Sequence, residues 1–187
     1  MLRTNQTFLN YFKEIYKKDE ARGNLELAFF SRGEKLLIQG QQVSRIMLIK
    51  EGIVKCYFAE ENGKEYIVEF LGGGEILGEI ELIKNTVCLC GIEALSEVVV
   101  YTAGHSYFKS LIENDIKLNH LLLDVFADRI INTSSRASYQ QLYTIEHTLS
   151  QLLKMQAKQG MEISKENMAA YLGITVRSLN RILKNIN

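Results

Sequence analysis

The chain has 187 residues, 47% of them hydrophobic, which is enough to bury a core in one or two domains. It carries 22 Lys/Arg and 22 Asp/Glu residues, and a net charge of zero argues neither for nor against a nucleic-acid partner. No apolar run approaches the ~18 residues of a membrane span, and the polar, amphipathic N-terminus is not a secretion signal. Three cysteines, an odd number, favour a reducing compartment over a disulfide scaffold. We therefore expect a cytoplasmic protein that does not bind a membrane.

Charge is distributed unevenly along this neutral chain. From Arg136 to the end there are seven Lys/Arg and three Glu, so this third has an excess of four positive charges. The preceding residues have the matching negative excess. A modestly basic C-terminal segment beside an acidic body is typical of a DNA-binding module joined to another domain.

The first part of the chain predicts one helix followed by a barrel. Residues 5–20 have the spacing of an amphipathic helix that packs on the following domain. Short apolar or alternating runs then follow, separated by turn residues such as Asn62-Gly63, and glycine makes the corners because the chain has no proline. Eight short strands at regular spacing predict a sandwich or barrel. The predicted strands are Leu25–Phe30, Lys35–Ile38, Arg45–Lys50, Ile53–Ala59, Glu65–Leu71, Glu75–Leu77, Cys88–Ala94 and Glu97–Ala103.

Three helices are predicted after the barrel. Ser106–Ile112 is short, Asp115–Gln141 is long, and Ile145–Gln159 ends at a glycine. The long helix carries more apolar residues than one stripe requires, so we expect it to pack on its own domain and on a second body. A second copy of the chain is the body we favour.

The most informative stretch is Ile163–Lys184, which predicts two short helices joined by a tight turn. Ser164 and Thr175 are suited to cap the two helices, and Gly173 to end the first. Ala169 provides the small residue needed where the helices cross. This is the pattern of a helix-turn-helix, although a plain helical hairpin in a bundle would share much of it.

The second helix of this pair has a buried and an exposed face. Leu179, Ile182 and Leu183 form the apolar face. The outer face combines short hydroxyls, an amide and two arginines on a helix thin enough for a DNA major groove. Together with two flanking positions it supplies the expected DNA contacts: Thr175, Val176, Arg177, Ser178, Asn180, Arg181, Lys184 and Lys165.

We expect the DNA-contacting side chains to divide into two groups. Arg177 and Arg181, one turn apart, would each donate two hydrogen bonds to a guanine, and Val176 would contact a thymine methyl group. Asn180 is compatible with either an adenine or a phosphate. The remaining residues, Thr175, Ser178, Lys165 and Lys184, are expected to fix register through phosphates.

Four motifs in this order resemble the cyclic-AMP receptor protein/FNR family of bacterial transcription regulators. Arg32–Gly40 resembles the first barrel corner of the family, and Met47–Lys55 a strand pair of that barrel. Gly73–Glu79 resembles the Gly-Glu turn of cyclic-nucleotide pockets, and Arg177–Lys184 the recognition helix. The resemblance covers residues 25–187.

The resemblance implies an α+β fold with three parts. Residues 1–113 would form a cyclic-nucleotide-binding-like β-barrel, of double-stranded β-helix or jelly-roll type, with the N-terminal helix. Residues 114–141 would form the long dimerisation helix, and residues 142–187 the helix-turn-helix domain. Family members usually continue into a β-hairpin wing, most of which this sequence lacks, so either the chain is incomplete or DNA binding is weaker.

The expected effector pocket follows the Gly-Glu turn and the facing long helix. By resemblance it comprises Gly78, Glu79, Ile80, Cys88, Leu89, Cys90, Thr133 and Ser134. In nucleotide-binding members a glutamate at the position of Glu79 bonds the ribose, and an arginine about ten residues later holds the phosphate. Residues 85–90 contain no arginine, and Lys84, the only cation nearby, is expected on the wrong side of the loop. Because an unpaired phosphate is costly in an apolar pocket, we expect no tight binding of cyclic nucleotides.

Several residues of this pocket have structural alternatives. In an equally favoured structural role, the Glu79 carboxylate accepts hydrogen bonds from backbone N–H groups of its own loop. In the same interpretation, Thr133 and Ser134 are ordinary helix residues. Cys56, Cys88 and Cys90 are interpreted chiefly as small buried residues, with a thiol-based sensor as the alternative. Their spacing does not suit a zinc or iron–sulfur site, and the scattered histidines do not suggest haem. The sequence therefore identifies no cofactor.

These observations predict a homodimeric DNA-binding regulator that is controlled by an unidentified small molecule. RNA polymerase is a further partner implied by the family. No residue set resembles a catalytic site, and a cupin-type metal enzyme would need barrel histidines that the sequence lacks up to Tyr101. The alternative is a cyclic-nucleotide-binding-like or thiol-sensing module that acts on a protein partner.

Overall fold

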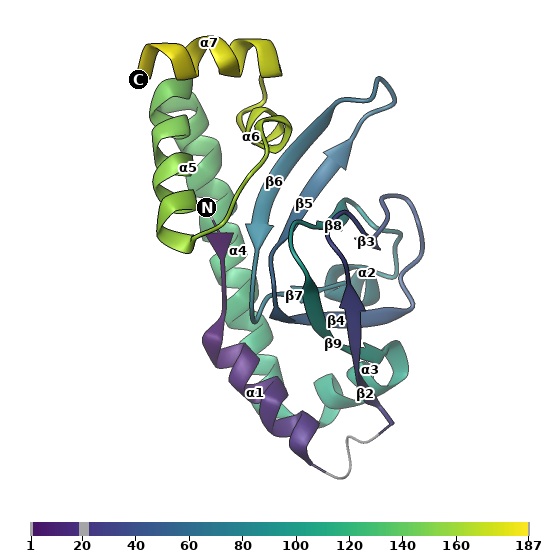
Figure 1. The fold of residues 1–187 in the computed structure, drawn as a ribbon. Coiled ribbons are helices and arrows are strands. Elements are labelled where there is room, and N and C mark those ends of the chain that lie inside the picture. The colour runs from purple at the N-terminus through teal and green to yellow at the C-terminus, as the bar shows by residue number, and fades with distance from the viewer. Residues whose placement is uncertain (1, 19–22, 187) are drawn as a thin grey trace.

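The computed structural model describes residues 2–18 and 23–186, and Figure 1 shows their arrangement. The fold is α+β, as the sequence predicts. One sheet has five strands in the order β1-β6-β5-β8-β3, and a second has four in the order β2-β9-β4-β7. The strands are β1 Leu2–Arg3, β2 Leu25–Phe30, β3 Lys35–Leu37, β4 Arg45–Glu51, β5 Val54–Ala59, β6 Glu65–Leu71, β7 Ile76–Leu77, β8 Gly91–Ala94 and β9 Val98–Gly104.

All eight predicted strands are present, with β2 and β6 at the predicted bounds. β5 and β6 form an antiparallel hairpin whose turn contains Asn62-Gly63, and Gly63 takes the positive φ of 76° that this turn requires. Between the two sheets lies an apolar cluster drawn from both, including Ile49, Val54 and Val100. The strand pattern therefore closes around one core, as expected of a barrel.

The helix α1, Gln6–Lys17, covers one end of the barrel. Asn5 caps it, because the Asn5 side chain accepts a hydrogen bond of 2.9 Å from the backbone N–H of Phe8. Gly74 lies against this cap with a positive φ of 85°, and a Cβ there would lie 1.8 Å from the backbone oxygen of Asn5. Only glycine fits this contact between the start of α1 and the barrel.

Six further helices follow α1. The short α2, Glu79–Lys84, and the two-residue strand β1 were not predicted from the sequence. The others are α3 His105–Asn114, α4 Ile116–Leu142, α5 Ile145–Gln159, α6 Lys165–Leu172 and α7 Val176–Ile186. α4 runs from the α1 end of the barrel up to the C-terminal helices, with α5 beside its upper part (Figure 1).

The C-terminal helices pack directly on the outer face of the barrel. A single apolar cluster joins Tyr57, Ile67 and Phe70 of the barrel to residues of α5, α6 and α7. The Phe70 ring stacks on Tyr171 of α6 with centroids 5.2 Å apart, and Figure 1 shows α6 beside β6. Sequence periodicity predicts these helices but not their contact with the barrel.

In the described parts of the chain, no helix is both long enough and apolar enough to cross a membrane.

Candidate functional site

The local sequence explains why α6 and α7 form a helix pair. The Ser164 hydroxyl accepts a 3.2 Å hydrogen bond from the Asn167 N–H, and the Thr175 hydroxyl accepts one of 3.1 Å from the Ser178 N–H. Gly173 ends α6 with a φ of 69°. Each cap uses the residue that the sequence predicts for it.

The crossing of α6 and α7 is also built from the predicted residues. Ala169 is 3% exposed, and Leu179 and Ile182 on α7 are 0% and 7% exposed. A small side chain on one helix and branched ones on the other let the helices approach closely. Packing therefore fixes which face of α7 is turned outward.

The outward face of the helix pair carries the predicted DNA-contacting residues. Thr175, Arg177, Arg181, Lys184 and Lys165 are exposed, whereas Val176, Ser178 and Asn180 are partly exposed. Among the ion pairs of the described residues, none involves a cation of this set. This face thus presents unneutralised arginine and lysine side chains to solvent.

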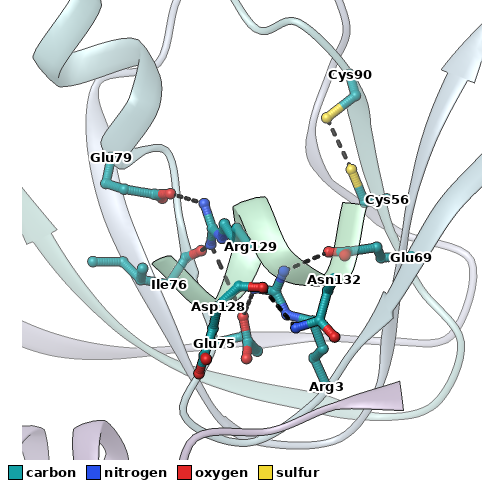
Figure 2. A network of polar contacts seen from close by, with 10 residues as sticks. All are labelled: Arg3, Cys56, Glu69, Glu75, Ile76, Glu79, Cys90, Asp128, Arg129 and Asn132. Atoms are coloured by element: carbon teal, nitrogen blue, oxygen red, sulfur yellow. Dashed lines mark hydrogen bonds and ion pairs between the residues drawn. The ribbon is translucent and has the colours of Figure 1, made fainter. Parts of the chain in front are cut away.

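The second candidate site is the predicted effector site around Glu79, which lies at the start of α2. Glu79 is 1% exposed, and Gly78 before it takes a φ of 88°. Arg129 of α4 reaches in, pairs with the Glu79 carboxylate, and donates a 2.7 Å hydrogen bond to the Ile76 backbone oxygen (Figure 2). Burial raises the pKa of Glu79, and the Arg129 charge opposes that rise.

A second arginine extends this pair into a network. Arg3 of β1 donates a 2.8 Å bond to Glu69 and also binds Glu75, whose carboxylate lies 4.0 Å from Arg129 (Figure 2). The network joins β1, the barrel and α4. The long helix is therefore held to the pocket by charge-assisted hydrogen bonds.

Arg129 is a pocket residue that sequence reasoning missed. The prediction that Lys84 is the only cation nearby is wrong, because Arg129 pairs with Glu79, whereas Lys84 itself is exposed. One signal was present: Arg129 interrupts the apolar run of the long helix, one turn before Thr133. A charge on the barrel-facing side of such a helix needs a buried partner.

The structure brings only part of the predicted pocket together. Gly78 and Glu79 are buried there, and Cys88 is 3% exposed within the apolar core of the barrel. The side chains of Ile80 and Leu89, by contrast, are 41% and 63% exposed. Ile80 is turned outward at the start of α2, and Leu89 lies in the loop before β8.

Thr133 and Ser134 are not brought to Glu79. Both are exposed on α4, one turn beyond Arg129. A role for them in the effector site remains a prediction that would need a second body against this face of α4.

The predicted strand Cys88–Ala94 is shorter in the structure. β8 begins at Gly91, so Cys88 and Cys90 lie in the loop before it. Cys90 meets Cys56 of β5, with 2.9 Å between the sulfur atoms (Figure 2). Within the described residues, no three His, Cys, Asp or Glu side chains are grouped to hold a metal ion.

Comparison with known proteins shows what the chain is similar to. The family model described as "Cyclic nucleotide-binding domain" matches residues 27–115. A probable transcriptional regulator, flp of Lacticaseibacillus casei, is 26% identical over 94% of this chain and 83% of its own. The cAMP-activated global transcriptional regulator CRP of Salmonella typhimurium is 24% identical over 80% of this chain and 76% of its own.

Solved structures agree with this result at the level of the fold. A putative transcriptional regulator of the crp/fnr family from Eubacterium rectale superposes with a TM-score of 0.76, at 16% identity, over 97% of this chain and 82% of its own. The barrel, the long helix and the terminal helix pair thus occur together in a known architecture. Residues 27–115 therefore match the cyclic nucleotide-binding domain family, and the chain as a whole is similar to transcription regulators of the cyclic-AMP receptor protein/FNR type.

Proposed function

We propose that this regulator binds double-stranded DNA through α7, as a homodimer, under the control of a small signal in the barrel that is not a cyclic nucleotide. The observation that carries the proposal is the outward face of α7. Arg177 and Arg181 are both exposed there and lie one helical turn apart, and the opposite face of the helix is locked by Leu179. A rigid helix with two free guanidinium groups fits a major groove, where an arginine can donate two hydrogen bonds to one guanine.

The roles within this face can be separated by substitution. Arg177→Ala should lose about 1–3 kcal/mol on the preferred sequence and little on other DNA, since a base contact is lost. Lys165→Ala should weaken binding to all DNA and lower the salt slope by about one.

The measurement is fluorescence anisotropy with DNA selected from a random pool, at several salt concentrations. Lys109→Ala, an exposed lysine on α3 away from α7, is the matched control and should match the wild type. Equal effects of the Arg177 and Lys165 substitutions would contradict the division of roles. If the wild type selects no DNA sequence, the DNA-binding proposal is wrong.

A stripe of exposed apolar residues on α4 supports the homodimer. Ile116, Leu123 and Ile130 recur every seven residues and are 70%, 65% and 68% exposed. A seven-residue apolar repeat is the seam of a two-helix coiled coil. Pairing two copies along this seam would also give two α7 helices, which must lie about 34 Å apart to enter successive major grooves.

Sedimentation analysis tests this interface. Leu123→Glu should shift the protein from dimer to monomer, because the seam would then bury two unpaired carboxylates. Asp124→Ala, the neighbouring exposed position outside the seam, should leave the dimer unchanged. A dimer that survives Leu123→Glu would place the interface elsewhere.

The state of the barrel pocket supports a signal other than a cyclic nucleotide. The guanidinium of Arg129 is already paired with Glu79, and residues 85–90 supply no arginine for a cyclic phosphate. A ligand in this pocket would have to compete with a buried ion pair for either partner. RNA polymerase is included as a partner on the strength of the family alone.

Calorimetric titration with cyclic AMP and cyclic GMP tests the ligand class. We expect no saturable binding at millimolar nucleotide, whereas the CRP of Salmonella typhimurium, described as cAMP-activated, serves as the positive control. Micromolar binding of either nucleotide would refute this part of the proposal and leave the DNA-binding part standing.

A further inference from the structure

We infer that Cys56 and Cys90 are a redox modification site, a dithiol that closes to an intramolecular disulfide and thereby changes how the C-terminal helices dock on the barrel. The inference goes beyond the proposed function and does not depend on DNA binding. It starts from the contact between these two side chains in Figure 2.

The geometry suits a bond between these two cysteines. Their sulfur atoms are 2.9 Å apart, against about 2.05 Å in a disulfide. Cys56 lies opposite Ile92 in the β5–β8 pairing, and Cys90 is the residue just before β8. Cys56 and Cys90 are both only partly buried, in contrast to Cys88. Cys88 is buried within the apolar core and is not part of the pair.

The two thiols are unequal, which assigns their roles. A hydrogen bond joins the Cys56 and Cys90 sulfur atoms, and this contact lowers the pKa of Cys90 and raises that of Cys56. Cys90 is therefore the better nucleophile at neutral pH, and Cys56 is the thiol that resolves the intermediate.

A peroxide is the oxidant in the proposed reaction. The Cys90 thiolate attacks one peroxide oxygen, so that a sulfur–oxygen bond forms, the oxygen–oxygen bond breaks, and the released hydroxide takes a proton to become water. The Cys56 sulfur then attacks the Cys90 sulfur, the sulfur–oxygen bond breaks, and the second oxygen leaves as water. Overall two thiols lose two electrons and two protons, and hydrogen peroxide is reduced to two waters.

The residues on either side of Cys56 connect the site to the C-terminal helices. The ammonium of Lys55 donates a 3.3 Å hydrogen bond to the Asn167 side chain of α6. Tyr57 is 4% exposed within the cluster that holds α5, α6 and α7. A displacement of β5 at Cys56 would therefore also displace Lys55 and Tyr57, which contact the C-terminal helices.

Cys90 is connected to the same docking contacts through its neighbour, Gly91. Gly91, next to Cys90, lies under the Tyr57 ring, so closely that a Cβ on it would be 2.7 Å from the ring atom Cζ. Drawing Cys90 toward Cys56 thus moves the backbone on which Tyr57 rests. Closing the disulfide would shift both the strand that carries Tyr57 and the surface beneath its ring.

Peptide mapping of the full chain tests the bond. The reduced protein is treated with hydrogen peroxide, alkylated, unfolded, alkylated with a second label and digested without reductant. We expect one cross-link, between Cys56 and Cys90, which dithiothreitol reverses, with Cys88 taking the second label. Fragment ions distinguish Cys88 from Cys90. The inference is overturned if Cys56 and Cys90 remain thiols in excess peroxide, or if the link involves Cys88.

Hydrogen exchange tests the consequence for docking. Peroxide should change the exchange of the α6 amides, residues 165–172, by severalfold in the wild type and in the control Cys88→Ser. Cys90→Ser should show no such change. A Cys56–Cys90 disulfide that leaves α6 exchange unaltered would disprove the coupling. Because neither readout uses DNA, failure here is distinguishable from failure of the proposed function.

Discussion

The two halves of α4 are attached to the molecule by different means. In the first half, Leu118, Leu121, Leu122 and Val125 are buried in the cluster that also holds α1 and α3. Between residues 127 and 142, by contrast, only Arg129 and Arg136 are not exposed, and both hold their places by hydrogen bonds to the barrel.

This difference indicates which part of the helix can change position. Apolar burial is non-directional and is lost only by separating the surfaces, so the first half forms a fixed base. The second half is held mainly by two guanidinium groups seven residues apart, with a further 2.6 Å bond from Gln140 to the Tyr66 hydroxyl, and such bonds can be exchanged for others at low cost. A signal that reaches Arg129 or Arg136 would therefore alter the upper part of α4 and leave its base in place.

The largest effect is expected in the fixed half. Leu118 is 0% exposed, so Leu118→Ala should lower the free energy of unfolding by about 4 kcal/mol, through lost burial and the cavity left behind. Leu142→Ala makes the same change in the second half, where the side chain is 74% exposed, and should cost little. Urea denaturation measures both, and similar losses would erase the contrast between the halves.

The next effect concerns the Arg129–Glu79 pair. Arg129→Met should cost about 3 kcal/mol at neutral pH, because it leaves a buried carboxylate without its cation. The pKa of Glu79 is already raised by burial and should rise further. The folded variant then holds a proton that the unfolded chain releases above about pH 4.3.

The sign of the resulting pH dependence follows from this proton. The free energy of unfolding of Arg129→Met should fall as pH rises through the window between the ordinary and the raised pKa. Denaturation at several pH values checks this, and adding Glu79→Gln should flatten the curve. A pH-independent loss would show that Glu79 is not the titrating group.

A smaller effect is expected for the second arginine. Arg136 donates to the backbone oxygens of Ile67 and Tyr171 at 2.8 and 2.9 Å, and stacks on the Tyr171 ring. Arg136→Lys keeps the charge but loses the planar fork, which should cost about 1–2 kcal/mol. Hydrogen exchange should show the loss mainly in α6. Uniform loosening of the barrel would contradict a local role.

The smallest effect is expected at the start of α4. Asp115 caps the helix by accepting from the N–H groups of Lys117 and Leu118, and it accepts a 2.7 Å bond from the Tyr11 hydroxyl. Asp115→Ala should cost about 1 kcal/mol. The Tyr11 bond lowers the pKa of Asp115, so this stabilisation should be present above about pH 3.9 and be lost as pH falls through the lowered value. Asp115→Asn retains a capping side chain and should remove the pH dependence.

Local features of this fold could be predicted from sequence, whereas contacts between distant segments could not. β2, β6 and α5 occur at their predicted bounds because alternation, helical period and glycine breaks are properties of neighbouring residues. β1 was missed because two residues carry no period and pair in parallel with β6, far along the chain. α2 was missed because six residues after a glycine resemble a loop.

The two candidate sites show the same contrast between local features, which the sequence predicts, and contacts between distant residues, which it does not. The outward face of α7 follows from the helical period and the buried Leu179. The pairing of Arg129 with Glu79 joins residues 50 apart, and the meeting of Cys56 with Cys90 joins residues 34 apart. No local pattern encodes either contact.

The glycine beneath the cap of α1 bears on how mutational surveys of this protein would be interpreted. In a saturation screen for regulator activity, every substitution of Gly74 should score as inactive, because any side chain would collide with the Asn5 backbone. Gly74 directly precedes the Glu75 of the arginine network, so such a result would resemble the signature of an effector contact. Abundance measured in parallel would separate the two: failure at Gly74 should appear as missing protein, and failure at a true ligand contact as protein that is present but unresponsive.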